Sequence, residues 1–272
     1  MLTQPLAKIN IGLHIVGKRP DGYHDLETIF YPIPLHDTLE TQVLPFGASL
    51  LFETEGINIP GNADDNLVVK VYRQMQQEFN LPPVRIKLHK RIPTGAGLGG
   101  GSSDAAEMMK QLNAIFRLGL SANEMEQRMS AFGADCPFFI RCHPVYATGI
   151  GNVFHPILLN LKGLNLALVK PNIHVSTAQA YAGVKVKSPA TDLRAVAAIP
   201  VELWKGRLVN DFEDGVFAQF PVIAAIKQRL YDLGVLYAAM SGSGSAVFAL
   251  SRQAIPELQS HFPDSFTYQS ML

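Results

Sequence analysis

The stretch from Pro93 to Asp104, PTGAGLGGGSSD, constrains the fold of this chain more than any other. Five glycines occupy the seven positions 95–101, and a helical pattern follows directly. Glycine loses much backbone entropy on folding, so a cluster this dense needs a structural reason. A loop whose backbone N–H groups close on an anion, in front of the positive end of a helix, is such a reason. We therefore predict a phosphate-binding loop; the alternative is a flexible linker, although a linker rarely runs straight into a capped amphipathic helix.

Three familiar kinds of glycine-rich loop fit this stretch poorly. Gly95, Gly97 and Gly100 have the spacing G-x-G-x-x-G, but the acid that a dinucleotide-binding fold needs about 20 residues later is missing, and the preceding sheet reads as antiparallel. A Walker A pattern also begins here, but Gly101 stands where its lysine belongs. The H-R-D and D-F-G segments of protein kinases are absent. A nucleotide held here must rely on backbone N–H groups, the helix dipole and the two following serine hydroxyls, with help from a metal ion.

Hydrophobic periodicity on both sides of the loop predicts a mixture of strands and helices. Strands are expected at 5–16, 26–33, 37–44, 49–54, 84–92, 145–151, 165–169, 236–240 and 246–250, with the runs in 26–54 forming an antiparallel sheet. Helices are expected at 67–79, from 105 to Gly119, at 124–132, near Tyr181, and from 221 to Gly234. The polar cluster 62–66, then Ser102 or Ser103, then Ser121 with Glu124, are expected to cap the first three helices.

Charge and cysteine content narrow the class of protein. Lys+Arg and Asp+Glu both number 23, so the net charge is zero, and neither nucleic acid nor an anionic membrane is expected as a partner. Cys136 and Cys142 fit neither a redox nor a zinc pattern, and we expect them to be reduced and buried. Because no signal peptide or membrane span is recognisable, we expect a cytoplasmic protein. We also expect a monomer or a weak homodimer.

Two charged residues stand among apolar neighbours. Lys8 lies in the strand pattern 5–16, on the face opposite Ile9 and Ile11, where it is either functional or simply solvated. Asp135 lies between alanine and cysteine and precedes Pro-Phe-Phe. An acid in such company is seldom a plain surface charge, although capping a short helix that starts near Pro137 is the alternative.

Two loops present groups suited to a small-molecule ligand. Tyr23 and His24 place an aromatic face beside a two-sided hydrogen-bonding ring, which suits a planar heterocycle. The local sequence slightly favours the alternative, an aromatic at a hairpin tip packed on the strand below. The segment SGSGS at 241–245 lies between two expected strands, but five small residues exceed what a hairpin turn needs.

Taken together, these segments resemble the GHMP kinase superfamily, named after galactokinase, homoserine kinase, mevalonate kinase and phosphomevalonate kinase. The matching segments follow the family's order over nearly the whole chain. They are AKIN at 7–10, GKRPDGYHDLETIF at 17–30, DDNL at 64–67, IPTGAGLGGGSSDAA at 92–106, GADCPFF at 133–139, NDFE at 210–213 and MSGSGSAVFAL at 240–250.

The resemblance implies a two-domain α+β fold. The N-terminal ATP-binding domain, 1–157, would be similar to ribosomal protein S5 domain 2, and the C-terminal domain, 158–272, would be ferredoxin-like, with ATP and substrate meeting between them. The combination of GKRPDGYH and GLGGGSSDAA is most similar to the branch that phosphorylates the 2-hydroxyl of a methylerythritol linked to cytidine diphosphate, in the non-mevalonate route to isoprenoid precursors. ATP and Mg²⁺ are the implied cofactors, and no protein ligand for the metal is predicted.

The resemblance also implies a role for each matched residue. Asp135 would be the catalytic base and Lys8 its partner. Tyr23 and Tyr181 would sandwich the cytosine, and His24 would hydrogen-bond its edge. Further substrate contacts would come from Asn10, near the methylerythritol end, and from Thr177, Gly242 and Ser243. The ATP-binding set would comprise Asn66, near the adenine, and Pro93, Thr94, Gly95, Ala96, Gly97, Leu98, Gly99, Gly100, Gly101, Ser102 and Ser103, around the phosphates.

Two positions depart from the family pattern: Cys136 stands where a branched aliphatic residue is usual, and Asn152 stands where Glu is common. Two other functions remain as alternatives. The G-Y-H segment argues against another small-molecule kinase of the superfamily. The zero net charge and the pairing of Lys8 with Asp135 argue against a non-catalytic, S5-like RNA-binding module.

Overall fold

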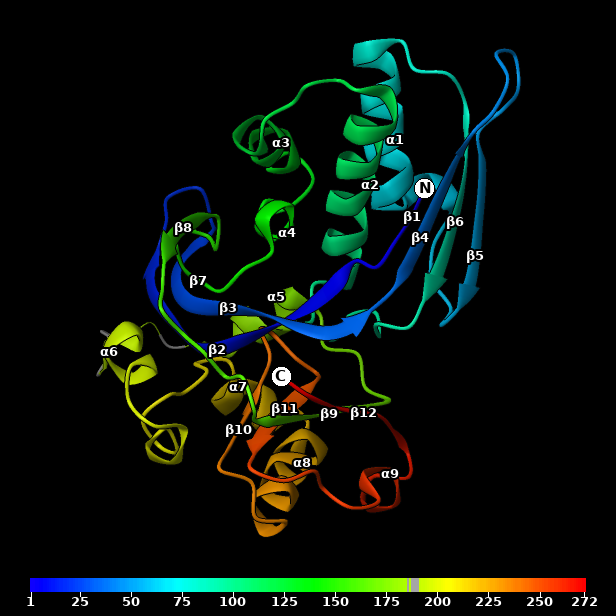
Figure 1. Cartoon of the computed structure of the whole chain (residues 1–272). Helices are drawn as coiled ribbons and strands as arrows, with labels where there is room; N and C mark the ends of the chain where they lie inside the picture. The colour runs from blue at the N-terminus through cyan, green and yellow to red at the C-terminus, as the bar shows by residue number, and fades with distance from the viewer. Residues whose placement is uncertain (185, 187–190) are drawn as a thin grey trace. The chain divides into compact units, whose positions relative to one another are not determined.

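The computed structural model describes residues 1–184, 186 and 191–272 (Figure 1). The strands are β1 (Leu2–Thr3), β2 (Leu6–Lys18), β3 (His24–His36), β4 (Thr38–Val43), β5 (Leu51–Gly56), β6 (Val84–Lys90), β7 (Val145–Thr148), β8 (Val153–Pro156), β9 (Asn165–Pro171), β10 (Tyr237–Met240), β11 (Val247–Ser251) and β12 (Ser265–Met271). The helices are α1 (Leu67–Phe79), α2 (Gly100–Phe116), α3 (Ala122–Met129), α4 (Phe138–Arg141), α5 (Thr177–Ala182), α6 (Leu193–Ala197), α7 (Glu213–Gln219), α8 (Pro221–Asp232) and α9 (Leu258–His261), with short 3-10 turns η1 (Ala63–Asp65) and η2 (Val201–Leu203). The predicted mixture of helix and strand is confirmed.

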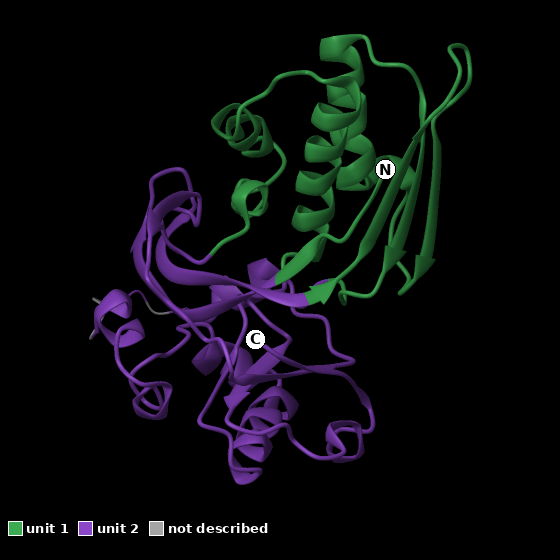
Figure 2. Ribbon diagram, viewed as in Figure 1, with its two compact units in different colours: residues 1–7, 35–94, 99–143 green, residues 8–34, 95–98, 144–272 purple. Residues whose placement is uncertain are grey.

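The chain forms two compact units, which Figure 2 colours separately. Unit 1 comprises residues 1–7, 35–94 and 99–143, and unit 2 comprises residues 8–34, 95–98 and 144–272. Neither unit is one continuous segment, because the chain passes between them several times, twice within the glycine-rich loop. The division into domains 1–157 and 158–272 stays a prediction.

Unit 1 contains a sheet with the strand order β1–β4–β6–β5 and the helices α1 and α2, which pack against each other (Figure 1). β4 runs antiparallel to both β1 and β6, whereas β5 runs parallel to β6. The expectation of one antiparallel sheet over 26–54 is therefore wrong, since β3 belongs to another sheet. The physical reason for the parallel pair is α1, which carries the chain from the end of β5 back to the start of β6.

The helix starts in unit 1 follow the predictions in two of three cases. The Asn66 side chain caps α1 by accepting a hydrogen bond from the Val68 N–H (2.9 Å), and Ser121 and Glu124 form a capping box at α3. The expected capping of α2 by Ser102 or Ser103 is wrong. The N-cap is Gly99, with φ +69°, a conformation that glycine adopts without strain. The helix therefore starts before both serines and contains them.

Unit 2 contains two sheets, β2–β3–β7–β8 and β10–β11–β9–β12; only the first two residues of β2 and the last two of β3 lie in unit 1. In the second sheet every neighbouring pair is antiparallel, and β10 and β11 form a hairpin around residues 241–245. One apolar core joins both sheets to the helices, and its members include Leu13 of β2, Val169 of β9, Leu230 of α8 and Val247 of β11. This shared core holds β2 close to the 241–245 connection.

Candidate active site

Lys8 is the most buried charged group of unit 2 that the sequence singled out, with 3% of its surface exposed. β2 is buried on both faces from Ala7 to Ile15, so the solvated-face alternative for Lys8 is wrong. Its ammonium donates to Asn10 Oδ1 (2.6 Å) and to the Gly97 carbonyl (3.1 Å), and it lies 4.9 Å from the centre of the Phe30 ring. These oxygens and the ring face offset the cost of burying the charge.

The Gly97 carbonyl is shared between two donors, because Ser241 Oγ also donates to it (2.9 Å). Ser241 Oγ in turn accepts a hydrogen bond from the Asn10 N–H (3.2 Å). Backbone bonds strengthen the junction, since the Lys8 N–H donates to the Leu98 carbonyl (3.0 Å). Strand β2, the loop segment 95–98 and the β10–β11 connection therefore form one hydrogen-bonded network within unit 2.

Two glycines of the loop are required by close approach. Gly97 has φ +75°, and a Cβ added there would lie 2.0 Å from the Ser241 carbonyl oxygen. Gly95 has φ +60°, and its Cβ would lie 2.5 Å from His174 Nδ1. Real Cβ atoms do not approach backbone oxygens so closely, so the loop can meet the second glycine-rich segment only where residue 97 has no side chain.

The Asn10 side chain is held in one orientation by groups on both sides of it. Its amide Nδ2 donates to Thr28 Oγ1 (3.0 Å), which donates to the Gly12 carbonyl (2.6 Å). This leaves Asn10 Oδ1 directed at the Lys8 ammonium. Gly242, with φ +54°, lies so near that its Cβ would be 3.2 Å from the same oxygen. Asn10 and Gly242 thus lie beside Lys8.

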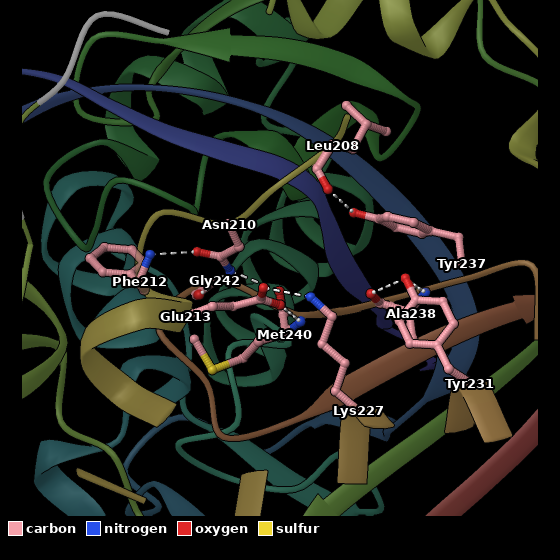
Figure 3. Close-up of polar contacts among 10 residues, drawn as sticks. All are labelled: Leu208, Asn210, Phe212, Glu213, Lys227, Tyr231, Tyr237, Ala238, Met240 and Gly242. Carbon is pink, nitrogen blue, oxygen red and sulfur yellow. Dashed lines mark hydrogen bonds and ion pairs between the residues drawn. The ribbon is translucent and has the colours of Figure 1, made fainter. Parts of the chain in front are cut away.

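A buried polar cluster behind the second glycine-rich segment was not predicted from the sequence (Figure 3). The Asn210 amide donates to the carbonyls of Met240 and Gly242, both at 2.8 Å. Glu213 accepts from the Met240 N–H (2.8 Å) and from the Lys227 ammonium (2.6 Å), and burial raises its pKa. The segment NDFE at 210–213 was one of the segments that carry the family resemblance, but no role was predicted for its residues. The signal that could have revealed the cluster is the presence of these polar residues next to an apolar helix.

The aromatic candidates also lie in unit 2. The rings of His24 and Tyr181 are stacked, with centroids 4.7 Å apart and an interplanar angle of 20°. The Tyr181 ring meets Phe212 edge to face at 4.9 Å. Tyr23 is 61% exposed, so the alternative in which it packs on the strand below is wrong. Two of the three predicted cytosine-binding rings therefore contact each other. The third ring, Tyr23, is exposed and could stack on a ligand.

Asp135 belongs to unit 1, whereas Lys8 belongs to unit 2. Asp135 is half-buried in the turn before α4, whose N-cap is Pro137, so the capping alternative is wrong. The neighbouring Cys136 is buried, and burial raises the pKa of its thiol to about 11. That cysteine is a packing residue with a protonated thiol at neutral pH.

The remaining predicted contacts are divided between the units. Unit 1 holds Asn66, Pro93, Thr94, Gly99, Gly100, Gly101, Ser102 and Ser103, and unit 2 holds Gly95, Ala96, Leu98, Thr177 and Ser243. Residues 100–103 form the first turn of α2, in which the Ser103 N–H donates to the Gly99 carbonyl (2.9 Å). The N–H groups of residues 100–102 have no acceptor within the helix, and together with the helix dipole they favour an anion. Thr177 is exposed at the start of α5, which Ser176 caps.

The part of the chain that the structure describes shows neither a metal-binding cluster nor a membrane-spanning helix. In that part of the chain, no three His, Cys, Asp or Glu side chains gather in a way that could hold a metal ion. None of its helices combines the length and the apolar character needed to cross a bilayer.

Comparison with known proteins places the chain in a family. Residues 66–143 match the GHMP kinases N terminal domain and residues 191–266 match the GHMP kinases C terminal domain. Relatives named 4-diphosphocytidyl-2-C-methyl-D-erythritol kinase, from Bacteroides fragilis and Parabacteroides distasonis, are 50% and 49% identical over 273 residues, covering 100% of both chains in each case. The chain belongs to the GHMP kinase family.

Solved structures agree with this assignment. The crystal structure of a 4-(cytidine 5'-diphospho)-2C-methyl-D-erythritol kinase matches with a TM-score of 0.82 and 30% identity, covering 99% of this chain and 98% of the other. A homoserine kinase from Cytophaga hutchinsonii matches with a TM-score of 0.69 at 15% identity, covering 98% and 94%, which shows a shared fold only. The predicted GHMP kinase fold is confirmed.

The close approach at Gly97 leads to a stability prediction. Gly97→Ala should lower the free energy of unfolding by more than about 2 kcal/mol, because the new Cβ clashes with a backbone oxygen at an unfavourable φ. Gly101→Ala is the matched control, since a Cβ there meets nothing within 4 Å; it should leave stability unchanged or raise it by up to about 1 kcal/mol. Urea denaturation followed through the fluorescence of Trp204, the single tryptophan, measures both. Equal stabilities of the two variants would contradict the packing described.

Proposed function

We propose that this protein transfers the γ-phosphoryl group of ATP to the 2-hydroxyl of 4-diphosphocytidyl-2-C-methyl-D-erythritol, a step of the non-mevalonate isoprenoid precursor pathway. The observation that carries the proposal is the buried Lys8 ammonium bonded to the Gly97 carbonyl of the glycine-rich loop. In a chain so similar to named kinases of this substrate over its full length, that contact puts a fixed positive charge beside the segment proposed to hold ATP. We also propose a cytoplasmic location and a monomer or weak homodimer.

The ATP phosphates would be held by backbone N–H groups rather than by a loop lysine. Residues 100–102 offer the N–H groups that have no acceptor within α2, and Asn66 at the start of α1 would lie near the adenine. Mg²⁺ would be bound chiefly by phosphate oxygens and water, because the described residues provide no cluster of three metal-binding side chains. The ion would neutralise phosphate charge as the phosphoryl group leaves.

The transfer itself would need one base and one fixed cation. Asp135 would accept the proton of the attacking hydroxyl, and Lys8 would keep that carboxylate ionised and offset charge on the transferred group. The hydrogen bonds that fix Lys8 leave its ammonium little freedom, which suits a group that must be in position before the reaction begins. Phosphoryl transfer depends on such positioning more than on covalent chemistry.

The cytidyl group would be recognised by Tyr23, His24 and Tyr181. His24 covers one face of Tyr181 in this structure, so a base inserted between the two tyrosines would displace the His24 ring toward the base edge. There its two nitrogens could exchange hydrogen bonds with cytosine. Stacking on an aromatic ring contributes about 1–3 kcal/mol per base, enough to favour a cytidyl substrate over a small alcohol.

A substrate panel tests the proposed reaction. With purified protein, Mg²⁺ and ATP in a coupled assay for ADP, 4-diphosphocytidyl-methylerythritol should be phosphorylated, and mevalonate and homoserine should give no rate above background. Phosphorus NMR of the product should place the new phosphate on the 2-hydroxyl. Turnover of mevalonate or homoserine at a comparable kcat/KM would refute the cytosine assignment.

Asp135→Asn tests the proposed base. The amide has nearly the same shape but cannot accept the proton, so kcat should fall by about 10²–10⁴, with the KM for ATP little changed. Steady-state kinetics give both constants, and an unchanged melting temperature shows that the fold is intact. A decrease in kcat of less than about tenfold would exclude Asp135 as the general base.

A further inference from the structure

A second buried lysine lies beneath the glycine-rich loop, in unit 1. Lys90, the last residue of β6, is 3% exposed and bonds Asp104 of α2 at 2.6 Å; it also bonds Asp37, the residue between β3 and β4. Asp37 is fully buried and Asp104 is 2% exposed. No local sequence pattern links the three residues, because Asp37 and Lys90 are 53 residues apart.

The cluster is connected to the backbone on both sides. Asp37 Oδ1 accepts hydrogen bonds from the N–H groups of Arg91 (2.5 Å) and Ile92 (2.8 Å), the residues that lead into the loop. Asp104 belongs to the N-terminal part of α2. Asp37 and Asp104 thereby join the entry of the loop to the helix that follows it, with the Lys90 ammonium between them.

The ammonium also lies directly against the turn that would hold phosphate. A Cβ added at Gly100 would be 3.0 Å from Lys90 Nζ and 2.8 Å from Ile92 Cγ2. A side chain at residue 100 would therefore clash with Ile92 and crowd the Lys90 ammonium, so this close packing requires glycine. A cation here is next to the positive end of a helix, an unfavourable position that the two carboxyl groups offset.

We propose that Lys90, bridged to Asp37 and Asp104, is a positioning residue for the phosphate-binding turn Gly99–Ser103. It fixes the free N–H groups of that turn from inside the fold and makes no contact with ATP itself. The inference rests on the proposed function insofar as the turn is taken to bind ATP.

The charge balance of the cluster supports a role in anion binding. Burial and the nearby Asp37 raise the pKa of Asp104 to about 8, against the lowering effect of Lys90. Burial alone would lower the pKa of Lys90, but the two carboxyl groups raise it. At pH 7 Asp104 is then largely a neutral carboxylic acid, so it adds little negative charge beside the Lys90 ammonium. The charged groups facing Asp104 are Lys90 and Asp37, and the ring of the adjacent His36 bonds the Asp37 carbonyl.

Deprotonation of Asp104 would add a negative charge beneath the turn. The buried Asp104 Oδ1 has no hydrogen-bond partner among the described residues, so no donor there stabilises the extra charge. ATP affinity should therefore decrease as the pH rises through about 8. The sign for folding is the same: an unfolded aspartate loses its proton near 3.8, so between that pH and about 8 the folded chain binds one proton more, and stability falls as the pH rises.

The first experiment compares Lys90→Met with Lys87→Met, a control on the same strand whose exposed side chain pairs with Glu55. Calorimetric titration with ATP and Mg²⁺ should show at least a tenfold weaker Kd for Lys90→Met and an unchanged Kd for Lys87→Met. In steady-state assays Lys90→Met should raise the KM for ATP and leave the KM for the cytidyl substrate within about twofold, because only the turn proposed to bind ATP loses its support. Equal ATP affinity in the two variants would overturn the inference.

The second experiment uses Asp104→Asn. It tests the positioning role of the Lys90 cluster even if Lys90→Met does not fold. Between pH 7.5 and 9.5 the wild-type Kd for ATP should rise about tenfold, and the variant should lack this dependence. Thermal denaturation between pH 5 and pH 8 should show a steeper loss of stability in the wild type than in the variant. Identical pH profiles would overturn the inference. A wild-type protein that binds no ATP at any pH would instead overturn the proposed function, and this inference with it.

Discussion

The Gly97 carbonyl oxygen accepts hydrogen bonds from Lys8 Nζ and Ser241 Oγ, and the organisation of unit 2 around its candidate site depends on this shared acceptor. Lys8 lies in a strand that is buried on both faces, so its charge needs partners that cannot move away. Leaving a buried hydrogen-bonding group without its partner costs about 1–3 kcal/mol, and more when the group is charged. This penalty keeps the loop segment 95–98 against β2, and the absence of a side chain at Gly97 makes the contact possible.

The glycine-rich loop contains no lysine of its own, but two lysines from other segments lie against it. Gly101 stands at the Walker A lysine position, yet Lys8 contacts the loop in unit 2 and Lys90 lies under its helix in unit 1. The two have different surroundings: Lys8 donates hydrogen bonds to the Asn10 amide oxygen and the Gly97 carbonyl, whereas Lys90 lies between two carboxyl groups. The first suits a group that acts on developing charge, and the second suits an anchor.

Local sequence signals predicted much of this arrangement, and its limits have a physical cause. The capping of α1 by Asn66 and the capping box at Ser121 depend on residues within a few positions, and both are confirmed. The sequence predicted that α2 begins at Ser102 or Ser103, because serine often caps a helix. A glycine with positive φ can serve as the N-cap equally well, and Gly99 does so here.

Contacts between distant segments were beyond such signals. Period two placed Lys8 on a polar face, but whether that face meets water or protein depends on the whole of unit 2. The clusters of Asp37 with Lys90 and of Asn210 with Glu213 depend on the sheet order, which no local pattern reveals. The roles of Lys8 and Asp135 came from resemblance to a family, and those roles stay predictions.

The most direct test of the role of Lys8 is to measure kcat and KM of the Lys8→Met variant separately. Methionine fills similar volume without charge, so substrate and ATP should still bind, with KM values within about threefold, while kcat should fall by at least about 100-fold, the size expected for a lost preorganised charge. Retained ATP binding by calorimetry and a cooperative thermal transition would show that the fold is intact. A variant with nearly wild-type kcat and a raised KM would contradict the account, because Lys8 would then bind the substrate and play no part in the transfer.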